Sequence, residues 1–268
     1  MIVRLLRSIV RSAWLVTLLL AAIVDFLLRR PRTTYDGAVR VHGWCRRIVR
    51  AMGVEGAVEG GLPAYGAVVS NHLSYLDVLL FCSLRPFVMV AKSEVRRWPL
   101  VGRLAAGAGT VFVVRGGGPS TYPGVNAAMA AAYRSGLPVL FFPEGTTTEG
   151  ASVLPFRRGL FHSVLNESVP LHVSALRYSI VGDSGRATVA QDVCWCGDAL
   201  LAPHLFRLLG MRGVRAEARF GGEVKERDDR FILSQTARAR VMELAAVSEG
   251  EATGILEPAR EPLLVQAT

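Results

Sequence analysis

The feature that most constrains this chain is an uncharged apolar run near its N-terminus. Residues 13–24 carry no charge, and the run reaches Leu28 if Asp25 is tolerated. A membrane-spanning helix needs about 20 apolar residues, so the run is marginal for a span. A signal peptide is the second interpretation, but no A-x-A cleavage site is evident and three arginines follow directly, at residues 29, 30 and 32.

Basic residues surround this run. Residues 1–60 hold ten arginines and four acidic residues, so they carry +6 of the net charge of +9. Apolar residues recur at helical spacing on both sides of the run: Ile2, Leu5, Leu6 and Ile9 before it, and Val41, Trp44, Cys45 and Ile48 after it. We predict two helices over residues 1–52, broken at residues 30–32, that lie in or on a membrane face with their arginines on lipid phosphates. The alternative is an ordinary core helix with a solvated charged face.

From about residue 64 the chain alternates short apolar runs with helical stretches. The predicted strands are residues 67–70, 87–91, 110–114, 138–142, 169–176 and 214–220, and the predicted helices are 74–84, 122–135, 159–166 and 229–246. This order predicts an α/β fold with a mixed, largely buried sheet flanked by helices. The predicted organisation is an N-terminal membrane-associating segment (1–60), an α/β domain (61–247) and a loose tail (248–268).

The composition and the net charge indicate which classes of partner this chain can bind. A sequence pI near 10.0 suggests an anionic partner, either nucleic acid or a membrane. The N-terminal arginines alternate with long aliphatic rather than stacking aromatic residues, so we expect an anionic membrane surface and no nucleic acid. Four scattered cysteines fit neither a disulfide scaffold nor a zinc site, and we expect no metal.

Four polar residues follow the first predicted strand of the α/β domain: Asn71, His72, Ser74 and Asp77. Ser74 with Asp77 fits a capping box, which places His72 before the first helical turn. There the Asp77 carboxylate can reach the imidazole, so the capping and His–Asp interpretations are compatible. A carboxylate that orients a histidine makes it a general base. No G-x-S-x-G string is present, so this base is expected to act on a hydroxyl of a bound substrate.

Two further groups lie at predicted strand ends. The first group begins at the end of the strand at 138–142 and consists of Phe142, Pro143, Glu144, Gly145, Thr146, Thr147 and Thr148. It would present a carboxylate, hydroxyls and free amides to a polar or phosphorylated group. Lys92 and Arg115 end two other strands and could together bind a phosphate, although each taken alone fits an ordinary surface charge.

Together these residues resemble the lysophospholipid acyltransferase family, which includes the 1-acylglycerol-3-phosphate acyltransferases. The family block N-H-x4-D is matched by Asn71, His72 and Asp77. The block G-x-x-F-x-x-R is matched by Gly109, Phe112 and Arg115, and F-P-E-G-T by residues 142–146. A fourth block, V-P-x-x-P-V, is met only in part by residues 169–173. The resemblance covers roughly residues 64–178.

The resemblance implies that His72, oriented by Asp77, deprotonates a lysolipid hydroxyl, which attacks an acyl thioester on coenzyme A or acyl carrier protein. The resemblance implies no other cofactor. It also implies that the protein lies at the cytoplasmic face of the inner membrane, either peripherally or through a single N-terminal anchor. The substrate-binding candidates are Asn71, Ser74, Lys92, Arg115, Glu144, Gly145, Thr146, Thr147 and Arg157.

The acceptor is expected to be 1-acyl-sn-glycerol-3-phosphate, giving phosphatidic acid. Thr147 stands where many members carry arginine, which points to another lysolipid such as lyso-ornithine lipid as the alternative. Arg157 or Arg158 could replace the missing charge. A non-catalytic lipid-binding protein is the alternative of a different class, and the intact His72 and Asp77 argue against it.

Overall fold

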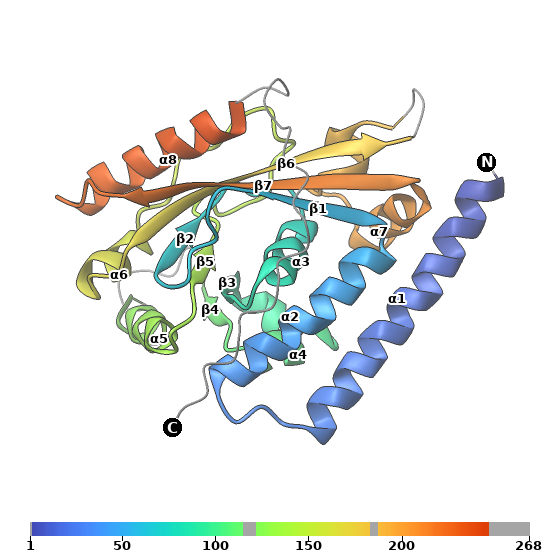
Figure 1. Ribbon diagram of the computed structural model, residues 1–268, viewed down its shortest axis with the longest axis horizontal. Coiled ribbons are helices and arrows are strands. Elements are labelled where there is room, and N and C mark those ends of the chain that lie inside the picture. Colours follow the sequence, from blue (N-terminus) through green and yellow to red (C-terminus); the bar gives the residue numbers. More distant parts are fainter. Residues whose placement is uncertain (1, 115–121, 183–186, 247–268) are drawn as a thin grey trace.

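A computed structural model describes residues 2–114, 122–182 and 187–246. Its centre is a seven-stranded mixed sheet in the order β1-β7-β6-β2-β5-β3-β4 (Figure 1). The strands are β1 (Val54–Glu59), β2 (Ala67–Val69), β3 (Val88–Lys92), β4 (Val111–Val113), β5 (Val139–Phe141), β6 (Leu171–Val181) and β7 (Gly213–Val224). β6 and β7 pair antiparallel, and the other neighbours pair parallel. The predicted α/β class is confirmed.

Helices cover both faces of this sheet (Figure 1). They are α1 (Ile2–Leu28), α2 (Thr34–Ala51), α3 (Tyr75–Leu84), α4 (Val101–Gly107), α5 (Tyr122–Arg134), α6 (Phe161–Asn166), α7 (Leu201–Gly210) and α8 (Arg230–Ala246), with short turns η1 (Ser93–Arg97) and η3 (Val189–Val193). α1, α2, α3 and α7 supply one hydrophobic core cluster, and α5, α6 and α8 supply the other.

Both faces of the short central strands β2 and β5 are buried. In β2, Val68 packs into the cluster under α3, while Ala67 and Val69 pack into the cluster under α8. In β5, Leu140 and its two neighbours divide in the same way. Successive strand residues point to opposite faces, so a strand covered on both sides reads as a continuous apolar run. This explains why the sequence pattern located these strands.

The two predicted N-terminal helices are present. Thr33 begins α2 with a reciprocal capping box: its hydroxyl accepts from the Asp36 amide at 3.1 Å, and its amide donates to Asp36 at 3.2 Å. Asp25 joins the helices, because it accepts from Trp44 Nε1 at 3.1 Å and from Arg40 at 3.3 Å. α1 also packs along α7, where Arg7 and Arg11 donate to the carbonyls of Gly210, Leu209 and Met211.

The rest of α1 faces outward with apolar side chains. Those more than half exposed are Ile2, Val3, Leu5, Leu6, Ile9, Val10, Trp14, Val16, Leu20, Val24, Leu27 and Leu28. Among the described residues there is one helix, α1, whose length and apolar composition would allow it to cross a membrane.

Several elements were not predicted. β1 lies inside the predicted segment 1–60, yet it pairs with β7, so the sheet includes residues before the proposed boundary at 60. α4 and α7 are also additional. Arg115 and the predicted tail 248–268 lie outside the described residues.

Candidate active site

The site begins where β2 ends against β6. Asn71 is nearly buried, and its side chain is joined to the backbone of Leu176: its Nδ2 donates to the carbonyl at 3.0 Å, and its Oδ1 accepts from the amide at 2.7 Å. This amide side chain imitates one more backbone pair between the two strands. It therefore fixes the chain immediately before His72, and its polar atoms are used by the protein.

His72 and Asp77 are in direct contact. His72 Nδ1 lies 2.7 Å from Asp77 Oδ2, and the same oxygen accepts from the amides of Leu73 at 2.6 Å and Ser74 at 3.0 Å. Ser74 is the N-cap of α3 and Asp77 is its third residue, so His72 precedes the first turn. The contact predicted from the spacing is present. Ser74 is fully buried, and it is its backbone amide, not its hydroxyl, that joins it to Asp77.

The imidazole of His72 is held on its face as well as at its edge. The Phe142 ring stacks on it with centroids 4.0 Å apart and planes within 6°. Nδ1 bound to the carboxylate leaves Nε2 as the atom that can accept a proton. The His72 side chain is 14% exposed, so Nε2 is the part of this pair that a substrate can approach.

Glu144 ties the two motif loops together. Its Oε1 accepts from the His72 amide at 2.7 Å and its Oε2 from the Leu154 amide at 2.8 Å. Burial raises the pKa of Glu144, while the two amide hydrogen bonds and nearby His72 act in the opposite direction. At 3% exposure it is placed to hold the loops rather than to contact a substrate.

The exposed part of the second loop is formed by Gly145, Thr146, Thr147 and Arg157. Gly145 has a φ of +73°, and Arg157 Nε lies 2.5 Å from the position that a Cβ there would occupy. The Arg157 amide donates to the Pro143 carbonyl at 2.8 Å. The guanidinium of Arg158 instead lies over the ring of Phe231 at 4.2 Å. Of the two arginines considered as replacement cations, Arg157 is therefore the one beside the loop.

The other predicted cations are less closely placed. Lys92 is half-buried at the end of β3, which pairs with β5 directly before the second loop. Arg115 lies outside the described residues. Among the described residues, no group of three or more His, Cys, Asp or Glu side chains could hold a metal ion.

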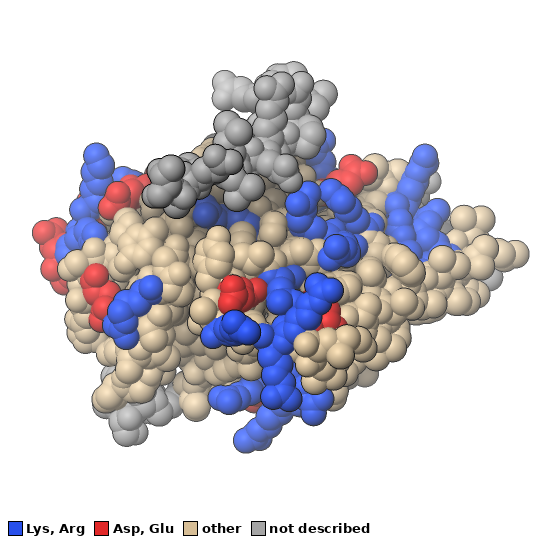
Figure 2. All heavy atoms as spheres, turned by 60° about the horizontal axis from the view of Figure 1, so that its bottom comes forward, with Lys and Arg blue, Asp and Glu red and all other residues tan. Residues whose placement is uncertain are grey.

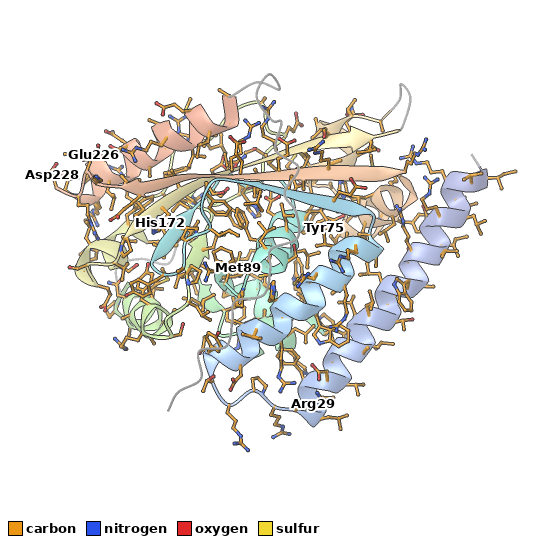
Figure 3. All side chains as sticks on the ribbon, viewed as in Figure 1. Arg29, Tyr75, Met89, His172, Glu226 and Asp228 are labelled. Atoms are coloured by element: carbon orange, nitrogen blue, oxygen red, sulfur yellow. The ribbon has the colours of Figure 1, made fainter. Side chains whose placement is uncertain are left out.

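Sequence reasoning missed Tyr178. Its hydroxyl donates to Asp77 Oδ1 at 2.6 Å from β6, 101 positions away in the chain. It also missed a neighbouring aromatic group: Tyr75, which Figure 3 places on α3, contacts Trp195 edge to face and forms a 3.2 Å hydrogen bond with His204 Nδ1 of α7. No local pattern could have found partners so distant in sequence.

Comparison with known proteins agrees with this geometry. The family model described as Acyltransferase matches residues 63–176. A lyso-ornithine lipid O-acyltransferase of Pseudomonas aeruginosa is 36% identical over 217 residues, which cover 78% of this chain and 81% of that protein. A 1-acyl-sn-glycerol-3-phosphate acyltransferase of Neisseria gonorrhoeae is 29% identical, over 67% of this chain and 69% of its own.

A solved structure shows the same fold. The 1-acyl-sn-glycerophosphate acyltransferase of Thermotoga maritima superposes with a TM-score of 0.60 at 17% identity, covering 89% of this chain and 96% of its own. The similarity to curated relatives extends over most of the chain, and the family match includes both motif loops. This chain therefore belongs to the lysophospholipid acyltransferase family, and it is an O-acyltransferase.

Proposed function

We propose that His72 is the general base of acyl transfer from a fatty acyl thioester to a lysolipid hydroxyl. The observation that carries this role is the 2.7 Å contact of His72 Nδ1 with Asp77, which leaves Nε2 of this 14% exposed side chain outside that contact. Nε2 takes the hydroxyl proton while the oxygen attacks the thioester carbonyl. The tetrahedral intermediate then expels the thiolate, which takes the proton from the imidazolium. Asp77 stabilises that imidazolium, and no acyl-enzyme forms.

The thioester is carried by coenzyme A or acyl carrier protein, and no metal takes part. Thr146, Thr147 and Arg157 line the exposed side of the second loop, next to Gly145, and bind the acceptor head group. Lys92 adds positive charge at the end of β3, and Arg115, outside the described residues, stays a predicted substrate-binding residue. Asn71, Ser74 and Glu144 have buried side chains, so they support the two loops and do not contact the acceptor directly.

For the acceptor we propose lyso-ornithine lipid, with the ornithine carboxylate against Arg157. Two observations favour it: the loop carries Thr147 with the Arg157 side chain beside Gly145, and a relative with that name matches this chain over 217 residues at 36% identity. The second candidate is 1-acyl-sn-glycerol-3-phosphate, which the Neisseria relative's name supports. A planar guanidinium pairs well with either a carboxylate or a phosphate.

The experiment is acyl transfer by the purified full chain from labelled acyl-CoA or acyl carrier protein to a panel of lysolipids. His72→Ala should lower the rate by about 10²-fold to 10⁴-fold, the usual contribution of a general base. His162→Ala, at an exposed histidine on α6, is the matched control and should keep the wild-type rate. Unchanged turnover in His72→Ala would exclude the base role, and the preferred lysolipid decides between the two acceptors.

We also propose that the outward face of α1 rests on an anionic bilayer, at the cytoplasmic face of the inner membrane. Its exposed apolar side chains support this, as do arginines 29, 30 and 32 in the link to α2. Figure 2 shows the molecule with the lower edge of Figure 1 brought forward, and basic side chains clearly outnumber acidic ones there. Apolar contact and attraction to anionic lipid act together at such a surface.

Vesicle flotation tests this docking. The double variant Ile9→Asp with Leu20→Asp places two charges on the outward face of α1 and should abolish flotation with phosphatidylglycerol vesicles. Phe231→Asp alters a similarly exposed apolar residue on α8, on the opposite side of the sheet, and should float as the wild type does. Flotation of the double variant would show that the contact lies elsewhere.

A further inference from the structure

The two oxygens of the Asp77 carboxylate have different surroundings. Oδ2 accepts from His72 Nδ1 and from two backbone amides of its own loop. Oδ1 accepts from the hydroxyl of Tyr178, which comes from β6. Asp77 is fully buried, and Tyr178 is 9% exposed. Tyr178 therefore contacts the carboxylate from the side opposite to His72, in a place that a bound substrate does not reach.

We propose that Tyr178 is a positioning residue that fixes the Asp77 carboxylate for its contact with His72. This inference rests on the proposed base role of His72. A carboxylate held only through Oδ2 could rotate about its side-chain bond, and the Tyr178 hydrogen bond opposes that rotation. The hydroxyl also stabilises the negative charge on a carboxylate that has no contact with water, which limits how strongly Asp77 attracts the imidazole proton.

The electrostatics agree with this donor role. Burial and the neighbouring Asp77 both raise the pKa of Tyr178 well above its usual value, so the hydroxyl remains a donor at the pH values where the enzyme is assayed. The other titratable groups around the pair are Glu144 from the second loop, Tyr75 from α3 and Cys194 after η3. All three are unchanged in a Tyr178 variant, so a shift in its pH profile reports the lost hydroxyl.

Tyr178→Phe removes this hydrogen bond and keeps the ring. The kcat should fall about tenfold, with the KM for the acceptor unchanged, because a hydrogen bond to a charged group is lost without any substrate contact. The carboxylate becomes more basic and holds the imidazolium more tightly. The acid limb of kcat/KM should therefore move to higher pH.

Tyr133→Phe is the matched control, because Tyr133 is also buried but packs in the other core cluster. It should keep the wild-type kcat and pH profile. Adding Tyr178→Phe to Asp77→Asn should lower kcat no further. Equal profiles for Tyr178→Phe and the wild type, or additive losses in the double variant, would overturn the positioning role. An active His72→Ala would instead refute the base role, so the two failures are distinguishable.

A second observation lies away from the dyad, in the angle between α1 and α2. An open groove of about 580 Å³ is lined there by apolar side chains such as Trp14, Leu18 and Val39 and by charged side chains from both helices. Asp25 accepts from Arg40 and Trp44, and Arg29 lies 3.9 Å from it, so its charge is met within the groove. Arg29, at the lower end of α1 in Figure 3, and Arg47 add positive charge.

From this charge pattern we infer that the groove holds one anionic phospholipid of the bilayer. An acyl chain lies between the apolar walls, and the phosphate pairs with Arg47, whose guanidinium stands 4.9 Å over the Trp44 ring. Apolar walls with a cationic rim match an amphiphile with an anionic head. Trp14 is both one of the exposed apolar side chains of α1 and part of the groove lining, so the groove borders the proposed membrane surface. This inference therefore rests on the proposed docking of α1.

Gly43→Leu tests the groove because Gly43 lines it and has room at the Cβ position, where the nearest neighbour is Arg47 Nη1 at 3.8 Å. Leucine also favours a helix over glycine. Native mass spectrometry of detergent-purified chain supplied with phosphatidylglycerol should show one bound lipid on the wild type and none on Gly43→Leu. Ala13→Leu, on exposed α1 surface outside the groove, should keep the lipid.

Equal lipid retention by Gly43→Leu, a wild type without lipid, or binding of lysophosphatidylglycerol alone would overturn this assignment. Detergent-purified chain needs no vesicle contact, so failure of docking in flotation is a separate result. Acyl transfer by Gly43→Leu in detergent should remain at the wild-type rate, which separates loss of the lipid from loss of the fold.

Discussion

The loop that follows β2 and the loop that follows β5 meet at the candidate site, and they use their polar groups differently. In the first, Asn71 and Asp77 are saturated by protein donors and acceptors, and only the far edge of His72 faces outward. In the second, Glu144 is buried, but Thr146 and Arg157 are exposed. The first loop is built to hold one imidazole in place, whereas the second can adapt to the group it meets.

This difference predicts the largest effect at Asp77. Asp77→Asn should lower kcat by about 10³-fold to 10⁴-fold, as loss of the orienting carboxylate does in other His–Asp pairs. The amide is close in shape, with its oxygen on the three N–H donors and its NH₂ group towards the Tyr178 hydroxyl. Folding should therefore persist. Steady-state kinetics measures kcat, and thermal unfolding measures the stability of the variant. A kcat within tenfold of the wild type would contradict the role of the first loop in holding the imidazole in place.

Gly145→Ala should have the next largest effect, because it disturbs the second loop in two ways. The φ of +73° becomes strained for alanine, and the new Cβ would displace Arg157. We expect kcat/KM to fall by about tenfold to 100-fold. Gly159→Ala, where a Cβ meets nothing within 4 Å, is the control. A loss shared equally by both variants would mean that the effect is not local to the loop.

Arg157→Gln should change recognition alone. The KM for the acceptor should rise about tenfold with kcat nearly constant, because a charge-assisted contact made equally in ground and transition states is lost. Arg158→Gln is matched in chemistry but stacks on Phe231, so it should leave KM unchanged. If Arg157→Gln lowers kcat instead, the second loop takes part in the chemistry and the contrast between the loops disappears.

The smallest effect concerns the pH dependence of stability at Glu144. Burial raises its pKa, so the folded chain binds this proton more tightly than the unfolded chain does. Its contribution to the free energy of unfolding therefore grows as the pH falls towards the raised pKa, and it is lost above that value. Glu144→Gln lacks this titration.

Denaturant unfolding of both proteins at about pH 7.5 and about pH 5.5 measures this dependence. The stability of the wild type relative to Glu144→Gln should be greater at the lower pH. A difference that stays constant or narrows would show that the two amide hydrogen bonds outweigh burial.

Local sequence predicted the first loop well. The contact of His72 with Asp77 depends on a capping pattern within six consecutive residues, so the local sequence contains all that is needed to predict it. The buried strands were found for a similar reason, since two covered faces produce a continuous apolar run. The two N-terminal helices followed from helical spacing on either side of a Pro-containing break.

The parts that sequence did not predict depend on distant segments. The Tyr178 hydroxyl reaches Asp77 only because β6 lies beside β2 in the sheet. Phe142 stacks on His72 because β5 lies on the other side of β2. β1 was missed because its interior residues are partly exposed and it owes its place to β7. The choice between Arg157 and Arg158 likewise required the position of Phe231 on α8.

The packing of α1 on α7 has a practical consequence. Arg7 and Arg11 satisfy carbonyls at the C-terminal end of α7, so α1 completes a second helix as well as presenting an apolar surface. Removing residues 1–32 to obtain a water-soluble enzyme would strip those carbonyls of their donors and uncover the α7 surface beneath. A better route to soluble material keeps both arginines and replaces only outward side chains such as Leu6, Val10 and Val24.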